Sequence, residues 1–587
     1  MIENSSAKVN RLSWVRRRQS SAILFVVVTA AFAASFGNEF IYDDHEVILK
    51  QPAPRSVTDV ARYFAEPHFV GLPYYRPITR ATLLVQKAIH GENPLPFHLF
   101  NAALMGCVAV LAFEWLRHPV FELSPRAAFL VALIFGVHPA ASSCVYAIAS
   151  GRETLMPAVF ILAACCAWAK RGKLWHVVSL TACAAALLCK EQAAVLPVLL
   201  ALLDLFGLSA LPAARGAWFW LRRYAALLPI MAGYFAIRHA LFGGGQYEIA
   251  LWGDPITPLL SYAFALQTIL APFNSLVYEP SAAAWFSWPR LVFVGCAVLG
   301  FVFLTSRTTS ATRKRICFWA GWFIVVQLPT ANLLKQEAPF DERYVALASL
   351  GLIAAVATLA SAAWSRAVIR RLTTAVGAAV ALASLAVSVH RAGYFRNDMV
   401  FAKQWLSTDA NSAEARHLFA WTLHSRGETE QAMPHFLAAV RINPNFAEAH
   451  HNLGAILALN GDAAGAAYHF SEVLRIMPAH PEAHYNLGIL LASQGQTAAA
   501  EVHFRAALRA DPRYVDAYNN LGVLLARQAR LAEATDLFSE ALRIAPDARE
   551  IHENIGQALE RQGRRDEAAV HFARARALAS PRRAVGK

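Results

Sequence analysis

Eleven apolar runs, separated by short charged loops, fill residues 21–390 of this 587-residue chain. A helix that crosses a membrane needs about 20 mostly apolar residues. Only 16% of the residues are charged, whereas soluble domains carry about 25%. The pattern therefore predicts an all-α, polytopic membrane domain. Its predicted spans are residues 21–37, 96–116, 126–141, 153–169, 174–189, 192–208, 223–242, 289–306, 315–331, 344–362 and 371–390.

The first run also has features of a cleaved signal peptide, because a basic flank precedes it and small residues end it. We interpret it as a retained helix, since ten further runs make it the first member of a bundle. Residues 1–20 then form a basic N-terminus on the cytoplasmic side.

Lys and Arg residues gather at alternate ends of the runs, and cytoplasmic loops of membrane proteins are rich in both. With eleven spans and a cytoplasmic N-terminus, all of these groups fall on the cytoplasmic side. They lie at residues 16–18, 117–126, 170–173, 215–223, 313–315 and 366–371. Counting the apolar stretch 259–270 as a span would break this agreement, so we predict an interfacial or re-entrant helix there. The net charge of +14 follows from this topology and does not indicate nucleic-acid binding.

The topology places the loop 38–95 and the C-terminal part of the chain on the outer face of the membrane. We predict a bacterial inner membrane, with this face in the periplasm. The loop begins with an acidic motif that contains Asp43, Asp44 and His45, and Glu66 and His68 lie further along it. Charged groups at the mouth of a membrane helix are costly and usually functional. The motif is therefore the first candidate for a catalytic site.

Cations occur at several outer junctions: Arg76, Arg152, Lys190, Lys335 and Arg343. Arg and Lys bind phosphate well, Arg through its forked donors. We predict that Arg152 and Arg343 contact the phosphate of a lipid carrier, with Lys190 and Arg76 next; simple pairing at the membrane surface is the alternative. Further candidates at outer helix ends are His98, Asn101, His138, Glu153, Glu191, Glu342 and Tyr344. Neither a metal-ligand spacing nor a disulfide framework is visible, and the need for a divalent metal stays open.

A 34-residue repeat begins after residue 412. Five units cover residues 413–582, after a predicted linker helix at 391–412 and before a tail at 583–587. Small residues and Phe recur at fixed positions, and a Pro follows each second helix, which is the tetratricopeptide pattern. Such repeats form an α-solenoid whose concave surface binds extended peptides.

Asparagines recur at one position of four repeats, and their amides suit a peptide backbone. Local capping or packing is the equal alternative. The four are Asn452, Asn486, Asn520 and Asn554. The histidines His450, His484 and His552 share another position, but a metal site among them is not expected, because helices pack about 10 Å apart.

The order of short motifs along the chain resembles that of the transmembrane and tetratricopeptide-repeat O-mannosyltransferases, within the GT-C glycosyltransferases. The matching motifs are Tyr42-Asp43-Asp44, Tyr75-Arg76-Pro77, His98-Leu99-Phe100-Asn101, His138-Pro139, Gly151-Arg152-Glu153, Lys190-Glu191-Gln192 and Glu342-Arg343-Tyr344. One departure is the run Ala140 to Ser143, where the family often has a further His and an acidic residue.

The resemblance implies transfer of a sugar, mannose in the family, from a polyisoprenyl phosphate carrier to a hydroxyl group of a protein acceptor. It also implies that Asp43 and Asp44 are catalytic, with Asp43 as the base. Two alternatives stay open: the same fold acting on a glycan or lipid acceptor, and a non-catalytic membrane scaffold that displays the repeats. The acidic pair favours an enzyme, because a scaffold does not need adjacent carboxylates at the membrane surface.

Overall fold

The computed structural model describes residues 2–65, 74–208, 217–242, 256–272, 287–330, 341–363 and 367–579. The chain divides into two compact units, residues 1–410 and 411–587, which we call the membrane unit and the repeat unit. Helices and loops make up all of the described residues, so the predicted all-α class is confirmed. The predicted candidates Glu66, His68 and Lys335 and the side chain of Tyr344 lie outside the described residues.

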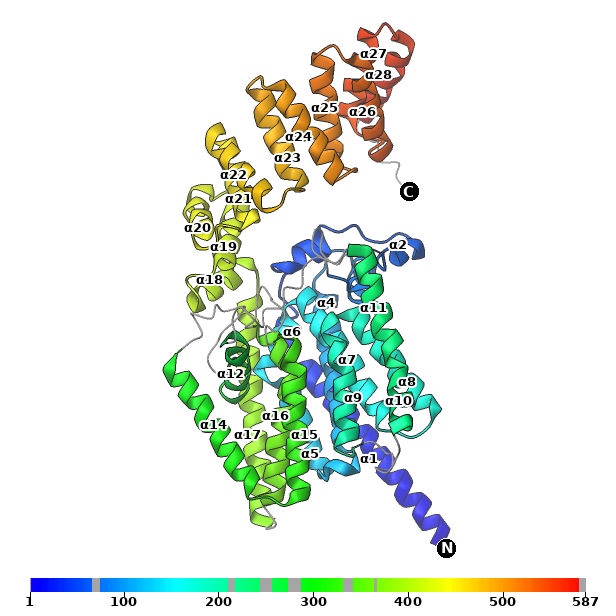
Figure 1. Cartoon of the computed structure of the whole chain (residues 1–587), viewed down its shortest axis with the longest axis vertical. Coiled ribbons are helices and arrows are strands. Elements are labelled where there is room, and N and C mark those ends of the chain that lie inside the picture. Colours follow the sequence, from blue (N-terminus) through cyan, green and yellow to red (C-terminus); the bar gives the residue numbers. More distant parts are fainter. Residues whose placement is uncertain are drawn as a thin grey trace. The chain divides into compact units, whose positions relative to one another are not determined.

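A helix occupies each of the eleven predicted spans (Figure 1). These helices are α1 (Ile2–Ala31), α4 (Leu95–Leu116), α5 (Pro125–Val137) with α6 (Pro139–Tyr146), α7 (Ile148–Trp168), α8 (Lys173–Cys189), η4 (Glu191–Val195) with α9 (Leu196–Leu205), α10 (Ala217–Ala225) with α11 (Leu227–Phe242), α14 (Trp288–Ser306), α15 (Ser310–Gln327), α16 (Glu342–Ala363) and α17 (Ala367–Ala392).

Length and composition allow seven helices of the described chain to cross a membrane, or eight if the bent pair α5–α6 is one span. The remaining predicted spans, at 174–189, 192–208 and 315–331, fall below that standard and stay predictions. Helix α12 (Ile256–Leu270) has only 15 residues, fewer than the about 20 that a span needs. Its length therefore agrees with the expected interfacial or re-entrant helix.

The predicted single span 126–141 is broken at His138, where α5 and α6 meet at 52°. The cause is local, because a residue that precedes proline is forced out of the helical conformation. His138 is extended, and Pro139 opens α6. The His138 Nδ1 atom accepts a hydrogen bond from Ala140 N at 3.1 Å, and Nε2 lies 3.1 Å from Ile269 O of α12. His138 therefore caps a broken helix and joins it to its neighbour.

The chain turns sharply again between α6 and α7, and the two helices touch at Gly151. A Cβ atom on Gly151 would lie 2.0 Å from the carbonyl oxygen of Cys144, so only glycine fits here. Asn101 of α4 donates to the carbonyl oxygen of Ile148 at 2.9 Å, which joins α4 to the first residue of α7. The predicted start of this span at residue 153 was therefore too late, since α7 begins at Ile148.

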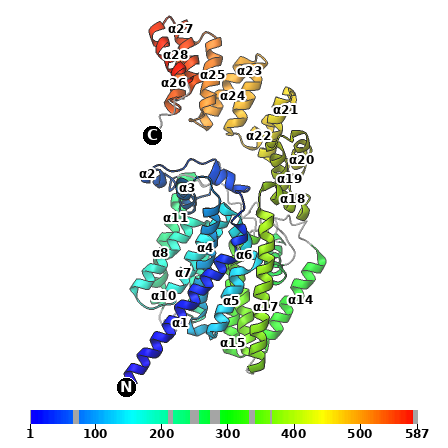
Figure 2. The same cartoon turned by 180° about the vertical axis from the view of Figure 1, so that it is seen from behind.

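The described residues of the loop after α1 form η2 (His45–Leu49), α2 (Val57–Arg62) and α3 (Pro77–His90), and the loop lies at the end of the bundle where α4 begins (Figures 1 and 2). We call this end the loop face. The segment predicted as a linker, 391–412, forms η7 (Gly393–Phe395) and α18 (Asp398–Thr408), and α18 packs with the membrane unit. Its Trp405 and Phe401 are fully buried.

The described part of the repeat unit, residues 411–579, consists of five helix pairs, as the 34-residue period predicts. They are α19 (Ala413–Ser425) with α20 (Thr429–Ile442), α21 (Ala447–Leu459) with α22 (Ala463–Ile476), α23 (Pro481–Ser493) with α24 (Thr497–Ala510), α25 (Val515–Arg527) with α26 (Leu531–Ile544), and α27 (Arg549–Arg561) with α28 (Arg565–Ala579). The recurring Phe packs over the recurring glycine: a Cβ atom on Gly488 would lie 2.8 Å from the Phe504 ring.

Candidate functional site

The two adjacent carboxylates of the acidic motif point into different surroundings. Asp44 is fully buried, and its oxygens accept hydrogen bonds from Ile41 N at 3.0 Å and Ala149 N at 2.7 Å. Burial raises the pKa of Asp44 to about 7, although both N–H groups favour the ionised form. Asp44 therefore fastens the motif to the first turn of α7. These contacts indicate a structural role, and a catalytic role of Asp44 stays a prediction.

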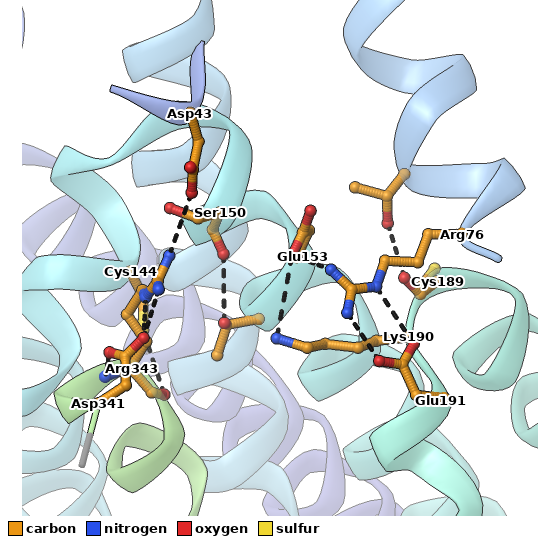
Figure 3. Close-up of polar contacts among 12 residues, drawn as sticks. Asp43, Arg76, Cys144, Ser150, Glu153, Cys189, Lys190, Glu191, Asp341 and Arg343 are labelled. Atoms are coloured by element: carbon orange, nitrogen blue, oxygen red, sulfur yellow. Dashed lines mark hydrogen bonds and ion pairs between the residues drawn. The ribbon is translucent and has the colours of Figure 1, made fainter. Parts of the chain in front are cut away.

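Asp43 is partly exposed, and its Oδ2 atom lies 3.9 Å from Nη1 of Arg343. Arg343 stands in the first turn of α16, next to Asp341. One oxygen of Asp341 accepts from Arg343 N at 2.8 Å and the other from Arg343 Nε at 2.6 Å. Asp341 thus caps the helix and also holds the guanidinium beside Asp43, as Figure 3 shows.

A second cluster of charged side chains lies around the junctions of α3, α7 and α8. Arg76, at the N-terminus of α3, forms a forked pair with Glu191, with Nε and Nη2 3.2 Å and 2.7 Å from its oxygens. The Nη1 atom of Arg76 also donates to Glu153 of α7. Lys190 approaches the same Glu153 oxygen at 4.0 Å, and Figure 3 shows these four side chains together.

Lys190 occupies a single extended residue between α8 and η4, which directs its side chain into this group. Burial and the nearby Arg76 lower the pKa of Lys190 to about 8, although Glu153 and Glu191 raise it. Arg343 also lowers this pKa. Arg343 and the cluster of Lys190, Arg76, Glu153 and Glu191 therefore interact electrostatically. Ser150 of α7 lies between Arg343 and Lys190 in Figure 3.

Two predicted candidates are placed away from these groups. Arg152 is fully buried, with Nε 3.1 Å from Asn101 Oδ1 and its guanidinium 4.4 Å from the Phe100 ring centre. His98 is also fully buried. These positions favour an interior role, and phosphate contact by Arg152 stays a prediction. A third candidate, Glu342 of α16, pairs with Arg391 of α17. Arg391 also donates a hydrogen bond to Pro139 O of α6 at 3.0 Å, so this arginine joins three helices.

Sequence reasoning missed three side chains that hold this region: Asp341, Arg391 and Asp398. Asp398 accepts from Tyr42 N at 2.8 Å and lies 2.7 Å from His45 Nε2. Its only sequence signal is a charged stretch directly after the last span. Among the described residues, no group of three or more His, Cys, Asp or Glu side chains is placed to hold a metal ion.

The repeat asparagines connect neighbouring units of the solenoid. The Nδ2 atom of each lies within hydrogen-bonding distance of a residue 35 positions earlier in the chain. The pairs are Asn452 with His417 at 2.8 Å, Asn486 with His451 at 3.3 Å, Asn520 with Tyr485 at 2.8 Å and Asn554 with Asn519 at 2.8 Å. These contacts favour the packing alternative, and peptide binding by these amides stays a prediction.

Replacing Asn520 by Ala should therefore loosen the solenoid. A hydrogen bond contributes about 0.5–1.5 kcal/mol net, so opening of the helix pairs on either side should become easier by that amount. Hydrogen exchange of the repeat amides in the full chain measures this effect. Asn460, exposed at the end of α21, is the matched control. Unchanged exchange with weakened binding of an acceptor peptide would instead support the peptide-binding alternative.

Comparison with known proteins matches the repeats to family models and part of the chain to named relatives. A family model described as tetratricopeptide repeat matches residues 485–549 and 537–583, and one described as TPR repeat matches 422–461. The human protein O-mannosyl-transferase TMTC4 is 29% identical over 196 residues, which covers 28% of this chain and 26% of that protein. Mouse TMTC3 is 28% identical over 207 residues, covering 33% and 21%. The matches thus span about a quarter of these relatives.

Solved structures are also similar to part of this chain. The crystal structure of MamA is 23% identical with a TM-score of 0.26, and it covers 27% of this chain and 94% of MamA. The structure of YrrB, described as a TPR protein with an unusual peptide-binding site, is 21% identical with a TM-score of 0.28, covering 30% and 91%.

Proposed function

We propose, from the relation of this chain to the TMTC protein O-mannosyl-transferases, that it is a membrane glycosyltransferase of the GT-C type. In this proposal it moves mannose from a polyisoprenyl phosphate carrier to a hydroxyl group of a protein acceptor, and the repeats present that acceptor. The observation that supports this most directly is the partly exposed Asp43 carboxylate, 3.9 Å from the Arg343 guanidinium on the loop face.

The proposed reaction is a direct displacement at the anomeric carbon of the sugar. The acceptor oxygen forms the new bond to this carbon while the bond to the phosphate oxygen breaks, and the carrier leaves as polyisoprenyl phosphate. Asp43 takes the proton that the hydroxyl group loses. A positioned general base of this kind contributes about 10²–10⁴ in rate. Asp44 is occupied by two backbone N–H groups and is the weaker candidate for this step.

The leaving phosphate needs donors at the same depth of the membrane, and we assign this role to Arg343 and Lys190. Arg343 lies beside the proposed base Asp43, whereas Arg76 pairs with Glu153 and Glu191. Burial, together with the nearby Arg76, lowers the pKa of Lys190 to about 8. An incoming phosphate would favour the charged lysine, so donor binding is coupled to the charge on this side chain.

Replacing Lys190 by Met should raise the KM for the donor about 10-fold or more, because a hydrogen bond to a charged group contributes about 1.5–3 kcal/mol. In the unaltered protein, kcat/KM for the donor should fall as the pH rises through about 8, where Lys190 loses its charge. Lys190→Arg should abolish this fall, since arginine keeps its charge. The assay is mannosyl transfer from polyisoprenyl phosphate mannose to a Ser/Thr peptide by the purified protein in detergent.

Lys50→Met is the matched control, because Lys50 is an exposed lysine on the loop that carries the acidic motif, where it pairs with Glu46. An unchanged donor KM in a folded Lys190→Met protein would remove Lys190 from the phosphate site. Transfer to a glycan or lipid but not to the peptide would contradict the proposed protein acceptor and support a glycan or lipid acceptor. No transfer to any of them would favour the scaffold alternative.

We also propose that the loop face lies outside the cytoplasm, in the periplasm of a bacterium. The basic residues Arg117 and Lys170 follow the ends of α4 and α7, whereas the acidic motif and Lys190 lie at the opposite ends of these helices. Lys and Arg favour the cytoplasmic side of membrane proteins. A lipid-linked sugar exposed on the other leaflet would then meet Asp43 directly.

A further inference from the structure

The backbone beside the proposed base is held in an unfavourable conformation. Tyr42, directly before Asp43, has φ of +46°, in a region that L-residues other than glycine seldom adopt. Such a conformation persists only where the surroundings determine it, and it often marks a functional site. The contacts that hold Tyr42 therefore identify what sets the direction of Asp43.

The carboxylate of Asp398 makes contact on both sides of the acidic pair. Its Oδ1 atom accepts a hydrogen bond from Tyr42 N at 2.8 Å, and its Oδ2 atom lies 2.7 Å from His45 Nε2. Residues 42 and 45 flank Asp43 and Asp44, so one side chain spans the turn that carries the proposed base. Asp44 fastens the opposite side of this turn to Ala149.

The helix that bears Asp398 is itself well fixed. Asn397 caps α18 by accepting from Val400 N at 3.1 Å, and an aspartate in the first turn of a helix is stabilised by the helix dipole. The Tyr42 ring packs edge-on against Trp405 of the same helix, with ring centres 5.6 Å apart. Upstream, Glu39 N donates to Arg396 O at 3.0 Å. The motif therefore lies along a firm surface made by residues 392–405.

We infer that Asp398 is a positioning residue for Asp43: it holds Tyr42 and His45 so that the Asp43 carboxylate faces Arg343 and the acceptor. This inference rests on the proposed function of Asp43 as the base. Asp398 acts through the backbone and His45, and its loss should act on the same step as loss of Asp43. A misplacement of about 1 Å in an active site lowers rates about 100-fold.

The test combines Asp398→Ala with Asp43→Asn in the full-length protein in detergent. Asp398→Ala alone should lower kcat about 10- to 100-fold, with the donor KM and the number of donor-binding sites unchanged. The kcat of Asp398→Asn should lie between those of the unaltered protein and Asp398→Ala, because the asparagine oxygen still accepts a hydrogen bond from Tyr42 N. In the Asp43→Asn background, Asp398→Ala should lower kcat by less than a further threefold, since the effects of residues that act as one unit are not additive. Lys403→Ala, exposed on the same helix, should leave kcat unchanged.

Each opposing outcome has one meaning. Full activity of Asp398→Ala beside an inactive Asp43→Asn would overturn the positioning role but leave the proposed function standing. Equal fold losses in both backgrounds, or a reduced number of donor-binding sites, would show a general folding defect and would also overturn it. Normal activity of Asp43→Asn would overturn the proposed function itself. If Asp398→Ala does not fold, the Asp398→Asn variant carries the same comparison.

Discussion

Asp43→Asn should lower the initial rate of mannosyl transfer by about 100- to 10,000-fold, the usual contribution of a general base. Asparagine has the shape of aspartate but cannot take the acceptor proton. The side chain is partly exposed and its contact with Arg343 is long, at 3.9 Å, so the fold should tolerate the change. The rate is measured with excess polyisoprenyl phosphate mannose and acceptor peptide, and the melting temperature is recorded for the same preparation.

Glu46→Gln is the matched control for this experiment. Glu46 lies three residues after Asp43, and its exposed carboxylate pairs with Lys50. Its removal should change the transfer rate less than twofold, since surface ion pairs contribute only about 0–1 kcal/mol. A near-normal rate for Asp43→Asn would make the acidic motif structural and would favour the scaffold alternative.

Gly151→Ala should destabilise the membrane unit by about 3 kcal/mol or more, at the upper end of the usual cost of overpacking. The new Cβ atom would lie 2.0 Å from the Cys144 carbonyl oxygen and 2.7 Å from its carbon. Both are backbone atoms, so a rotamer change cannot relieve the overlap. The α6–α7 turn would have to open, which moves Ala149 away from Asp44. We expect a lower melting temperature in detergent, together with a reduced transfer rate.

Gly300→Ala provides the comparison, because a Cβ atom there meets nothing within 4 Å. It lies within α14, where alanine is the better helix former by about 0.8–1 kcal/mol. That variant should melt at the same temperature or higher. A Gly151→Ala protein with unchanged melting temperature and transfer rate would contradict the close approach of Gly151 to the Cys144 carbonyl group.

Periodicity predicted the helices better than the site. Eleven apolar runs and a 34-residue repeat depend on many residues each, so single errors average out, and each predicted span overlaps a helix or a pair of consecutive helices. A site residue depends on one side chain. Arg152 and Lys190 both stand at helix ends beside short motifs, yet Arg152 turns inward to Asn101 whereas Lys190 joins Glu153 and Arg76. Position along the helix was predictable, but side-chain direction was not.

Contacts over long sequence distances were beyond sequence reasoning for another reason. Asp398 and Tyr42 are separated by 356 positions, and no local pattern connects them. The break at His138, in contrast, has a local cause in the sequence, because Pro139 follows it. The sequence marks His138-Pro139 as a candidate site motif, whereas its geometry places it at the corner of a broken span.

The constant spacing of the asparagine contacts bears on how this chain can change its length during evolution. Asn486 meets His451 and Asn520 meets Tyr485, in both cases 35 positions earlier. Loss of a block such as residues 481–514 would bring Asn520 opposite His451, the same partner type that Asn486 now has. Unequal crossing-over between such units therefore inserts or deletes whole repeats without creating a new kind of junction. Descendants of this chain can gain or lose a repeat while the membrane unit stays unaltered.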